Sequence, residues 1–149
     1  MLFSKSFSYA LRGILYIAVV QEEKQRVPLE EIADKVGAPK HFMGKVLKRL
    51  VKENLLCSVK GPTGGFYLQE GTLSTPILTI VGITDGLAGF KTCILRFVEC
   101  NLQNPCPMHA KVEATIKELK EMIGQTTVGE LLTNDKERLL ASIATVNHV

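Results

Sequence analysis

Residues 28–68, PLEEIADKVGAPKHFMGKVLKRLVKENLLCSVKGPTGGFYL, decide the fold. Apolar residues recur at helical spacing in two parts of this stretch, first from Leu29 to Val36 and then over residues 40–53. Gly37, a residue type that commonly follows the last turn of a helix, separates the two parts. Two helices joined by a short glycine-containing turn, the second of them basic on its outer face, predict a helix-turn-helix.

A β-hairpin is predicted directly after the second of these helices. Apolar residues at 55–59 and 66–68 indicate two short strands on either side of a glycine-rich tip at residues 60–65. A helix-turn-helix followed by a hairpin is a winged helix, and the wing spans about residues 58–69. The glycines would let the wing backbone approach a DNA phosphate closely, although an ordinary tight hairpin has the same pattern.

Positive charge is concentrated in the same stretch. Residues 35–60 hold seven lysines and arginines against one acid, Glu53, a net charge of +6 in a chain whose total is +3. Such a face suits nucleic-acid phosphates, and it is also compatible with a plain solvated helix face. We assign base reading to Lys40, His41 and Lys45, phosphate contacts to Lys48, Arg49 and Lys52, and wing contacts to Lys60, Thr63, Gly64 and Gly65. His41 fits an uninvolved surface histidine equally well.

The rest of the chain predicts helices around this motif. Helices are expected over residues 6–20 and 75–86, followed by an irregular segment at 87–107. From Met108 onward a long helix is predicted, which Gly124 ends. Its apolar residues recur at the spacing of a coiled-coil seam, which requires a partner; they are Val112, Ile116, Leu119 and Ile123. A last amphipathic helix is expected from Asp135 to about Val146.

These elements predict a mainly α fold with a small β-hairpin in three parts. They are a winged helix-turn-helix domain (1–86), a cysteine-containing loop (87–107), and a long dimerisation helix with a C-terminal helix (108–149). The 149 residues are 46% hydrophobic, enough for one core with an appended arm. No apolar run reaches the roughly 18 residues of a membrane span, and residues 1–20 lack a signal-peptide cleavage pattern. We therefore expect a cytoplasmic protein without membrane contact, in which disulfides are rare.

Three of the four cysteines gather in the irregular segment. Cys93, Cys100, Cys106 and His109 follow one another with six, five and two intervening residues. Thiolate and imidazole ligands select iron–sulfur clusters or zinc over hard cations. The residues alone leave three interpretations open: an iron–sulfur centre, a zinc or thiol-redox switch without iron, and ordinary buried thiols. Cys57, among apolar residues of the wing, fits an inert core thiol better than a ligand.

Four segments together resemble the Rrf2 family of bacterial repressors. They are EEIADKVG, FMGKVLKRLVKENLL, SVKGPTGGFYL and the C-x6-C-x5-CPMH pattern, and the likeness extends from Ser4 to about Leu132. The wing sequence GPTGGF is its most specific motif. The resemblance implies a homodimer joined through residues 108–123, with two recognition helices in successive major grooves of a pseudo-palindromic DNA operator.

The resemblance also implies an iron–sulfur cluster, with a two-iron two-sulfur form favoured and a four-iron four-sulfur form possible. The three cysteine ligands of the family match Cys93, Cys100 and Cys106. The fourth ligand is a histidine three positions after the third cysteine in some members, where His109 stands here. In others it is an acidic residue early in the partner's first helix, and residues 3–9 contain no carboxylate. The first gap, six residues instead of five, departs from the family pattern.

The predicted function is therefore that of a DNA-binding repressor modulated by a cluster in its cysteine loop. A change in the cluster would reshape the loop and move the long helix that follows it. Two alternatives are a cluster-free zinc or thiol-redox regulator and a winged-helix module that binds protein. We predict no enzyme, because the three histidines lack catalytic partners at recognisable spacing and GPTGG lacks the Lys-Ser/Thr tail of a phosphate-binding loop.

Overall fold

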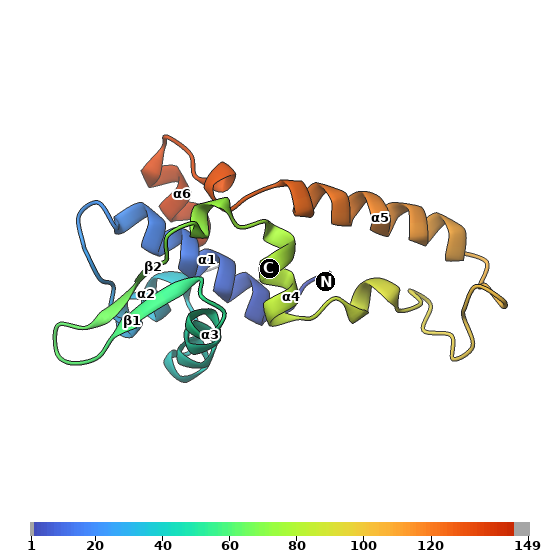
Figure 1. Cartoon of the computed structure of the whole chain (residues 1–149), viewed down its shortest axis with the longest axis horizontal. Helices are drawn as coiled ribbons and strands as arrows, with labels where there is room; N and C mark the ends of the chain where they lie inside the picture. Colours follow the sequence, from blue (N-terminus) through green and yellow to red (C-terminus); the bar gives the residue numbers. More distant parts are fainter. Residues whose placement is uncertain (1, 145–149) are drawn as a thin grey trace.

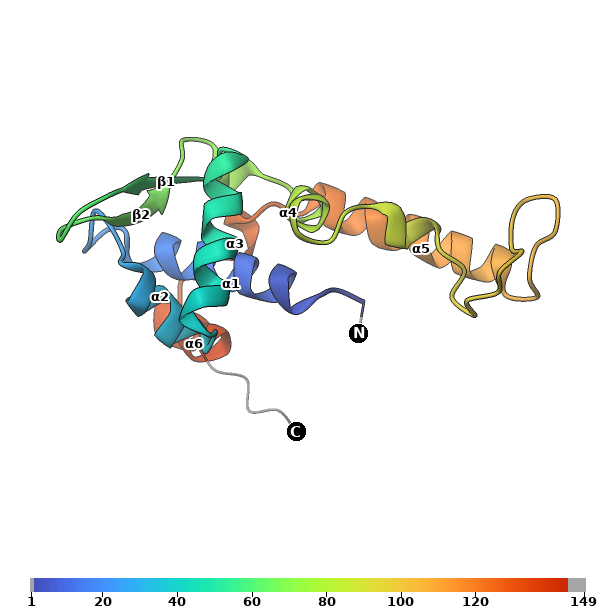
Figure 2. The same cartoon turned by 90° about the horizontal axis from the view of Figure 1, so that it is seen from below.

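Helix α1 (Lys5–Val20) is the centre of the molecule in the computed structural model, which describes residues 2–144. Its apolar stripe, including Ile14 and Ile17, is fully buried because helices pack against several of its sides. The Ser4 hydroxyl accepts a hydrogen bond from the Phe7 amide at 3.1 Å and so caps the first turn. Figures 1 and 2 show the other helices of the body and the hairpin arranged around α1.

The predicted helix-turn-helix is present. Helix α2 (Leu29–Val36) ends at Gly37, whose φ of 71° is the left-handed conformation that glycine adopts without strain. The Ala38 amide closes the turn by donating to the Ala33 carbonyl at 2.9 Å. Helix α3 (Lys40–Lys52) follows Pro39, one residue shorter than the sequence pattern indicated. Its buried face packs on both α1 and α2.

The hairpin consists of β1 (Leu56–Val59) and β2 (Gly65–Leu68), paired antiparallel with Leu56 opposite Leu68. Its second strand also docks on the segment before α2. The Val27 amide donates to the Phe66 carbonyl at 2.9 Å, and the Phe66 amide donates back to the Val27 carbonyl at 2.8 Å. The wing is therefore fixed to the helix-turn-helix through backbone bonds at its base.

A second group of elements leads away from this body. The short turn η1 (Thr72–Ser74) and helix α4 (Ile77–Thr84) are followed by η2 (Ala88–Lys91), a single 3-10 turn within the segment predicted to be irregular. The cysteine loop then leads into helix α5 (His109–Gln125). In Figure 1, α5 extends away from the body, and the loop lies at its far end.

Helix α5 does not end at Gly124, as the sequence suggested, but at Gln125. Gly124 lies inside the helix, where a Cβ would be 3.5 Å from a Leu78 methyl group of α4. The helix ends where the chain becomes extended, because the Thr126 carbonyl accepts a hydrogen bond from the Ile77 amide at 2.9 Å. The 3.5 Å to Leu78 is an ordinary van der Waals distance, so packing does not require glycine here, and extended pairing explains where the helix stops.

The chain returns to the body through the turn η3 (Gly129–Leu131) and helix α6 (Lys136–Ile143). Helix α6 packs on α1 with Ile143 buried. It ends three residues before Val146, the expected end, which lies outside the described residues. None of the helices within residues 2–144 has the length and apolar character of a membrane span.

Candidate metal centre and nucleic-acid interface

Three thiols converge at the N-terminal end of α5, the end that lies away from the body. The sulfur atoms of Cys93, Cys100 and Cys106 all lie within 4.8 Å of one another, and those of Cys93 and Cys106 are 3.7 Å apart. Each side chain is half-buried, and the structure contains no disulfide among them. Cys57, on β1, stands apart from this group, which we call the thiol triad. Residues up to thirteen positions apart in the chain therefore form one compact set of soft donor atoms.

His109 is the first residue of α5 and adjoins the triad through one cysteine. Its Nδ1 lies 3.4 Å from the Cys100 sulfur, and its backbone amide donates to the Cys106 carbonyl at 3.0 Å. The Cys106 amide in turn points at the Cys100 sulfur, 3.4 Å away. The start of the helix is thus joined to the cysteine loop by both side-chain and backbone contacts.

The surroundings of the triad shift the pKa values of Cys93 and Cys100 in opposite directions. The backbone amide of Phe97, assisted by that of Leu95, stabilises the thiolate of Cys93 and lowers its pKa. The Cys106 amide also favours the Cys100 thiolate, but burial and the two neighbouring thiols outweigh it and raise the pKa of Cys100. A cation at the triad would favour thiolates at all three positions.

The residues present fit a thiophilic metal group. A tetrahedral ion with metal–sulfur bonds of about 2.3 Å places its sulfur ligands about 3.8 Å apart, close to the 3.7 Å between Cys93 and Cys106. Three thiols with a nearby imidazole also supply the ligand types that iron–sulfur centres use. Carboxylates are absent from the triad, so magnesium and calcium do not suit it.

The outer face of α3 carries an exposed polar stripe. His41, Lys45, Lys48 and Lys52 recur at intervals of four, three and four residues and are exposed on the side opposite the core. Of the other basic residues on α3, Lys40 lies toward α2, where its ammonium is 2.5 Å from a Glu30 carboxylate oxygen. Arg49 lies toward α4 and donates to the Thr84 carbonyl at 3.4 Å.

The wing presents Lys60 and Thr63 to solvent, while Gly64 and Gly65 are half-buried. Both glycines are needed by the fold itself. A Cβ on Gly64 would lie 2.0 Å from the Val59 carbonyl oxygen, and one on Gly65 would lie 2.6 Å from the Val27 carbonyl oxygen. Close backbone approach within the chain therefore accounts for these two residues independently of any DNA contact.

Two surfaces were not foreseen from the sequence. Phe42 is one of the apolar residues at helical spacing in α3, but its side chain is 38% exposed. Between Cys93 and Cys106, the cysteine loop exposes five large apolar side chains, namely Ile94, Leu95, Phe97, Val98 and Leu102. The run of apolar letters between Cys93 and Cys100 was the available signal for this second surface, since a loop that lies on the surface usually carries polar residues.

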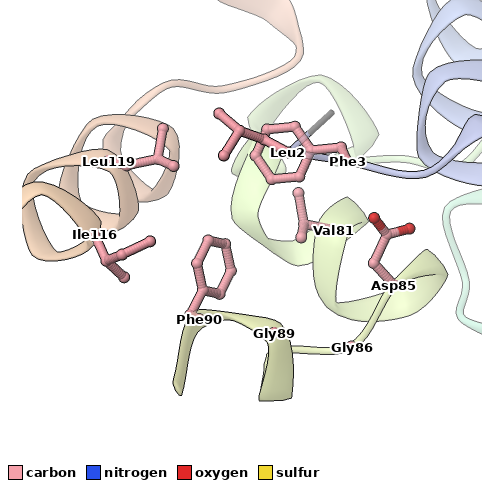
Figure 3. A pocket seen from close by; sticks show the side chains of 9 residues that line it. All are labelled: Leu2, Phe3, Val81, Asp85, Gly86, Gly89, Phe90, Ile116 and Leu119. Atoms are coloured by element: carbon pink, nitrogen blue, oxygen red, sulfur yellow. The ribbon is translucent and has the colours of Figure 1, made fainter. Parts of the chain in front are cut away.

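An apolar cavity of about 220 Å³ lies between the start of the chain, α4, η2 and the middle of α5. Figure 3 shows Phe3 and Phe90 on opposite sides of it, with Ile116 and Leu119 of α5 along a third side and the Asp85 carboxylate at the edge. The seam of α5 thus faces this hollow, and its residues other than Ile123 are only half-buried.

Taken together, an exposed basic helix in a helix-turn-helix and a docked wing define a winged-helix DNA-binding regulator. The family model of Rrf2, described as iron-dependent transcriptional regulators, matches residues 3–134. The chain therefore belongs to the Rrf2 family, as the sequence motifs indicated, and is a transcriptional regulator.

Individual relatives agree with this assignment. An HTH-type transcriptional regulator of Aquifex aeolicus is 30% identical over 141 residues, covering 93% of this chain and 96% of the relative. The HTH-type transcriptional regulator IscR of Vibrio parahaemolyticus is 25% identical, covering 86% of this chain and 75% of the relative.

Solved structures share the fold. CymR, the global cysteine regulator of B. subtilis, superposes with a TM-score of 0.69 at 19% identity, covering 87% of this chain and 94% of that one. IscR of T. potens gives a TM-score of 0.66 at 20% identity, covering 91% and 88%. The winged-helix architecture with its long helix is thus shared by regulators of different names.

Proposed function

We propose that this chain is a homodimeric, operator-binding repressor whose affinity for DNA depends on a metal centre held by Cys93, Cys100 and Cys106. The observation that carries the proposal is the convergence of the three sulfur atoms within 4.8 Å at the start of α5. The same helix packs on α4, and α4 packs on α3. A group bound at the triad is therefore two helix contacts away from the basic helix.

We assign an iron–sulfur cluster to the triad, with the two-iron two-sulfur form favoured. The iron-dependent description of the family and the three-cysteine set support iron, and His109 is the candidate fourth ligand because its ring nitrogen already adjoins Cys100. When bound, the cluster supplies sensitivity to iron supply and oxidation. The chain's own part is to hold the loop and the first turn of α5 in one arrangement.

A zinc or cluster-free thiol switch is the second candidate, because three thiols without a carboxylate also suit a single zinc ion. The 3.7 Å between the sulfurs of Cys93 and Cys106 matches two ligands of a single tetrahedral ion. The three cysteines would then hold a redox-inert ion that thiol oxidation releases. DNA binding by α3 and the wing is common to both candidates.

The dimer is supported by the incomplete burial of the α5 seam. Val112, Ile116 and Leu119 remain half-buried in the protomer, and the exposed Met122 extends the apolar surface. A second α5 packed along this seam would cover these side chains. The two α3 helices would then face successive major grooves of a pseudo-palindromic site, with Lys45, Lys48 and Lys52 directed at DNA.

The experiment is a metal and sulfide count on the anaerobically purified full chain, before and after reconstitution with iron and sulfide. We expect iron and acid-labile sulfide in the wild type and in the control Cys57→Ser, and their loss in Cys93→Ser. Zinc without sulfide would favour the second candidate instead. A protein that binds neither iron nor zinc would contradict the cluster and the zinc site, and would leave only a metal-free thiol switch.

Binding to the chain's own promoter, measured by mobility shift with loaded and stripped protein, tests the regulatory part. A difference of at least tenfold in affinity, about 1.4 kcal/mol, is expected between the two forms. Equal affinity would remove the metal dependence and leave only the DNA-binding function.

A further inference from the structure

A groove of about 310 Å³ lies between the start of α1, α3 and the end of α4. Six residues line it: Ser6 from α1, Phe42, Lys45, Val46 and Arg49 from α3, and Thr84 from α4. It runs along the flank of the exposed stripe of α3, and Lys45 belongs to both. We call it the flank groove.

The flank groove is lined by both basic and apolar side chains. Its two ionisable residues, Lys45 and Arg49, are both cationic. The three ion pairs found within residues 2–144 involve other cations, namely Lys24, Lys40 and Lys136. Ser6 adds a hydroxyl from the first turn of α1, where the helix dipole also favours an anion. The groove therefore offers three kinds of donor to one negatively charged group.

Contacts with neighbouring residues hold two of the groove's side chains in place. Arg49 donates one N–H to the Thr84 carbonyl at 3.4 Å, which leaves other guanidinium donors available. The Phe42 ring packs edge-to-face on Tyr9, with 5.6 Å between centroids and 74° between planes. The Arg12 guanidinium also lies over the Tyr9 ring, 5.5 Å from its centre. The cation and the aromatic ring are thus oriented before any ligand arrives.

The opposite flank of α3 lacks this character. Lys40, the cation on that side, is already neutralised by Glu30 at 2.5 Å. When a helix enters the major groove, sugar–phosphate backbone runs along its flanks. Charge complementarity therefore favours a backbone contact on the side of Arg49 over one on the side of Lys40.

We propose that the flank groove binds one phosphodiester of the operator backbone, with Ser6, Lys45 and Arg49 donating to its non-bridging oxygens. Phe42 packs against the adjoining deoxyribose. The proposal rests on the proposed function in one respect, namely that α3 reads DNA. It assigns Ser6 and Phe42, which the helix-turn-helix pattern does not assign, to DNA recognition.

The test uses the full chain and a duplex selected from a random DNA library. Neutral methylphosphonate links are placed at each backbone position in turn, and wild type is compared with Arg49→Ala, Ser6→Ala and the control Lys48→Ala. One symmetry-related pair of links should weaken wild-type binding by roughly tenfold or more. Arg49→Ala and Ser6→Ala should lose sensitivity at that same pair, because the contact is already absent.

Lys48→Ala should also weaken binding, because it removes a cation from the outer stripe, but it should keep the sensitivity at that pair. If Arg49→Ala shows the same loss of affinity at each methylphosphonate position as wild type, the flank groove does not bind a phosphodiester. That result would leave DNA binding by α3 intact. Failure of the wild type to select any duplex would instead overturn this site together with the proposed function.

Discussion

Ser4 and Asp85, 81 positions apart, are joined by two hydrogen bonds. The Ser4 amide donates to one carboxylate oxygen of Asp85 at 2.8 Å, and the Ser4 hydroxyl donates to the other oxygen. The same hydroxyl caps α1 by accepting from Phe7. The first residue before α1 is therefore tied to the first residue after α4, at the point where the chain leaves for the cysteine loop.

This contact predicts a pH-dependent contribution of Asp85 to stability. Burial raises the pKa of Asp85, but the hydrogen bonds from Ser4 outweigh burial and hold it below the usual 3.8. A depressed pKa in the folded state stabilises the fold above the unfolded pKa, and this contribution is lost as the pH falls through the folded pKa. Asp85→Asn should lower the free energy of unfolding at pH 7 by about 1 kcal/mol or less.

Urea unfolding at pH 7, 5 and 3 measures this effect. The difference between wild type and Asp85→Asn should persist at pH 5 and narrow at pH 3. A difference that stays constant over this range would show that the carboxylate charge does not stabilise the contact.

Arg12 predicts a second effect on stability, through the ends of two helices. Its guanidinium donates to the Val36 carbonyl at 2.8 Å and to the Ile143 carbonyl at 3.0 Å, the last residues of α2 and α6. Arg12→Gln should cost about 1–3 kcal/mol, because partly buried carbonyls lose their partner. The stability of Arg12→Lys should lie between those of wild type and Arg12→Gln, since an ammonium keeps the charge but lacks the planar guanidinium. Thermal unfolding gives the comparison, and equal stability of all three proteins would contradict this role.

Local patterns predicted most of the fold. Gly37 after a periodic apolar segment and the GPTGG tip located the turn and the wing to within one or two residues, because both depend on short-range geometry. The predicted end of α5 was wrong because the helix stops where the Thr126 carbonyl pairs with the Ile77 amide, a contact between segments far apart in the sequence. A glycine near the end of a periodic pattern does not show where such a long-range pairing stops the helix.

The site was less accessible to sequence reasoning. Spacing grouped Cys93, Cys100 and Cys106, but it could not give the 3.7 Å approach of the first and last, since that depends on the path of an irregular loop. Periodicity identified the basic helix, but not the partner of Lys40, which comes from α2. The exposure of Phe42 likewise depends on where α1 begins and α4 ends.

The Lys40–Glu30 ion pair predicts that Glu30→Gln strengthens DNA binding. Both side chains are exposed, so the pair contributes little stability, but releasing Lys40 adds an available cation beside α3. The expected gain is about two- to fivefold at low salt, and it should vanish as salt screens the charge. Glu22→Gln is the matched control, because it makes the same charge change at the ion pair with Lys136. Equal gains in the two variants would indicate a general charge effect.

The position of His109 beside the triad predicts that its replacement selectively weakens metal binding. His109→Ala should lower the metal affinity of the triad by roughly tenfold or more, because it removes the imidazole that adjoins Cys100. The matched control His41→Ala removes an exposed imidazole from α3 and should keep the full metal content. Chelator competition followed by metal analysis compares the two variants. Equal metal affinity in both would exclude His109 as a ligand.

Gly65 predicts that the base of the wing tolerates no side chain. A Cβ there would lie 2.6 Å from the Val27 carbonyl oxygen, the acceptor of the Phe66 amide, so Gly65→Ala must push β2 away from the segment before α2. We expect this variant to lower the free energy of unfolding by about 2–3 kcal/mol. Gly61→Ala is the control. The φ of Gly61, 106°, is strained for alanine, but nothing lies within 4 Å of the added carbon. This variant should therefore lower the free energy of unfolding by only about 1 kcal/mol. Hydrogen exchange should accelerate at the Phe66 amide in Gly65→Ala alone; equal exchange in both variants would mean that backbone strain, and not the clash with Val27, limits this position.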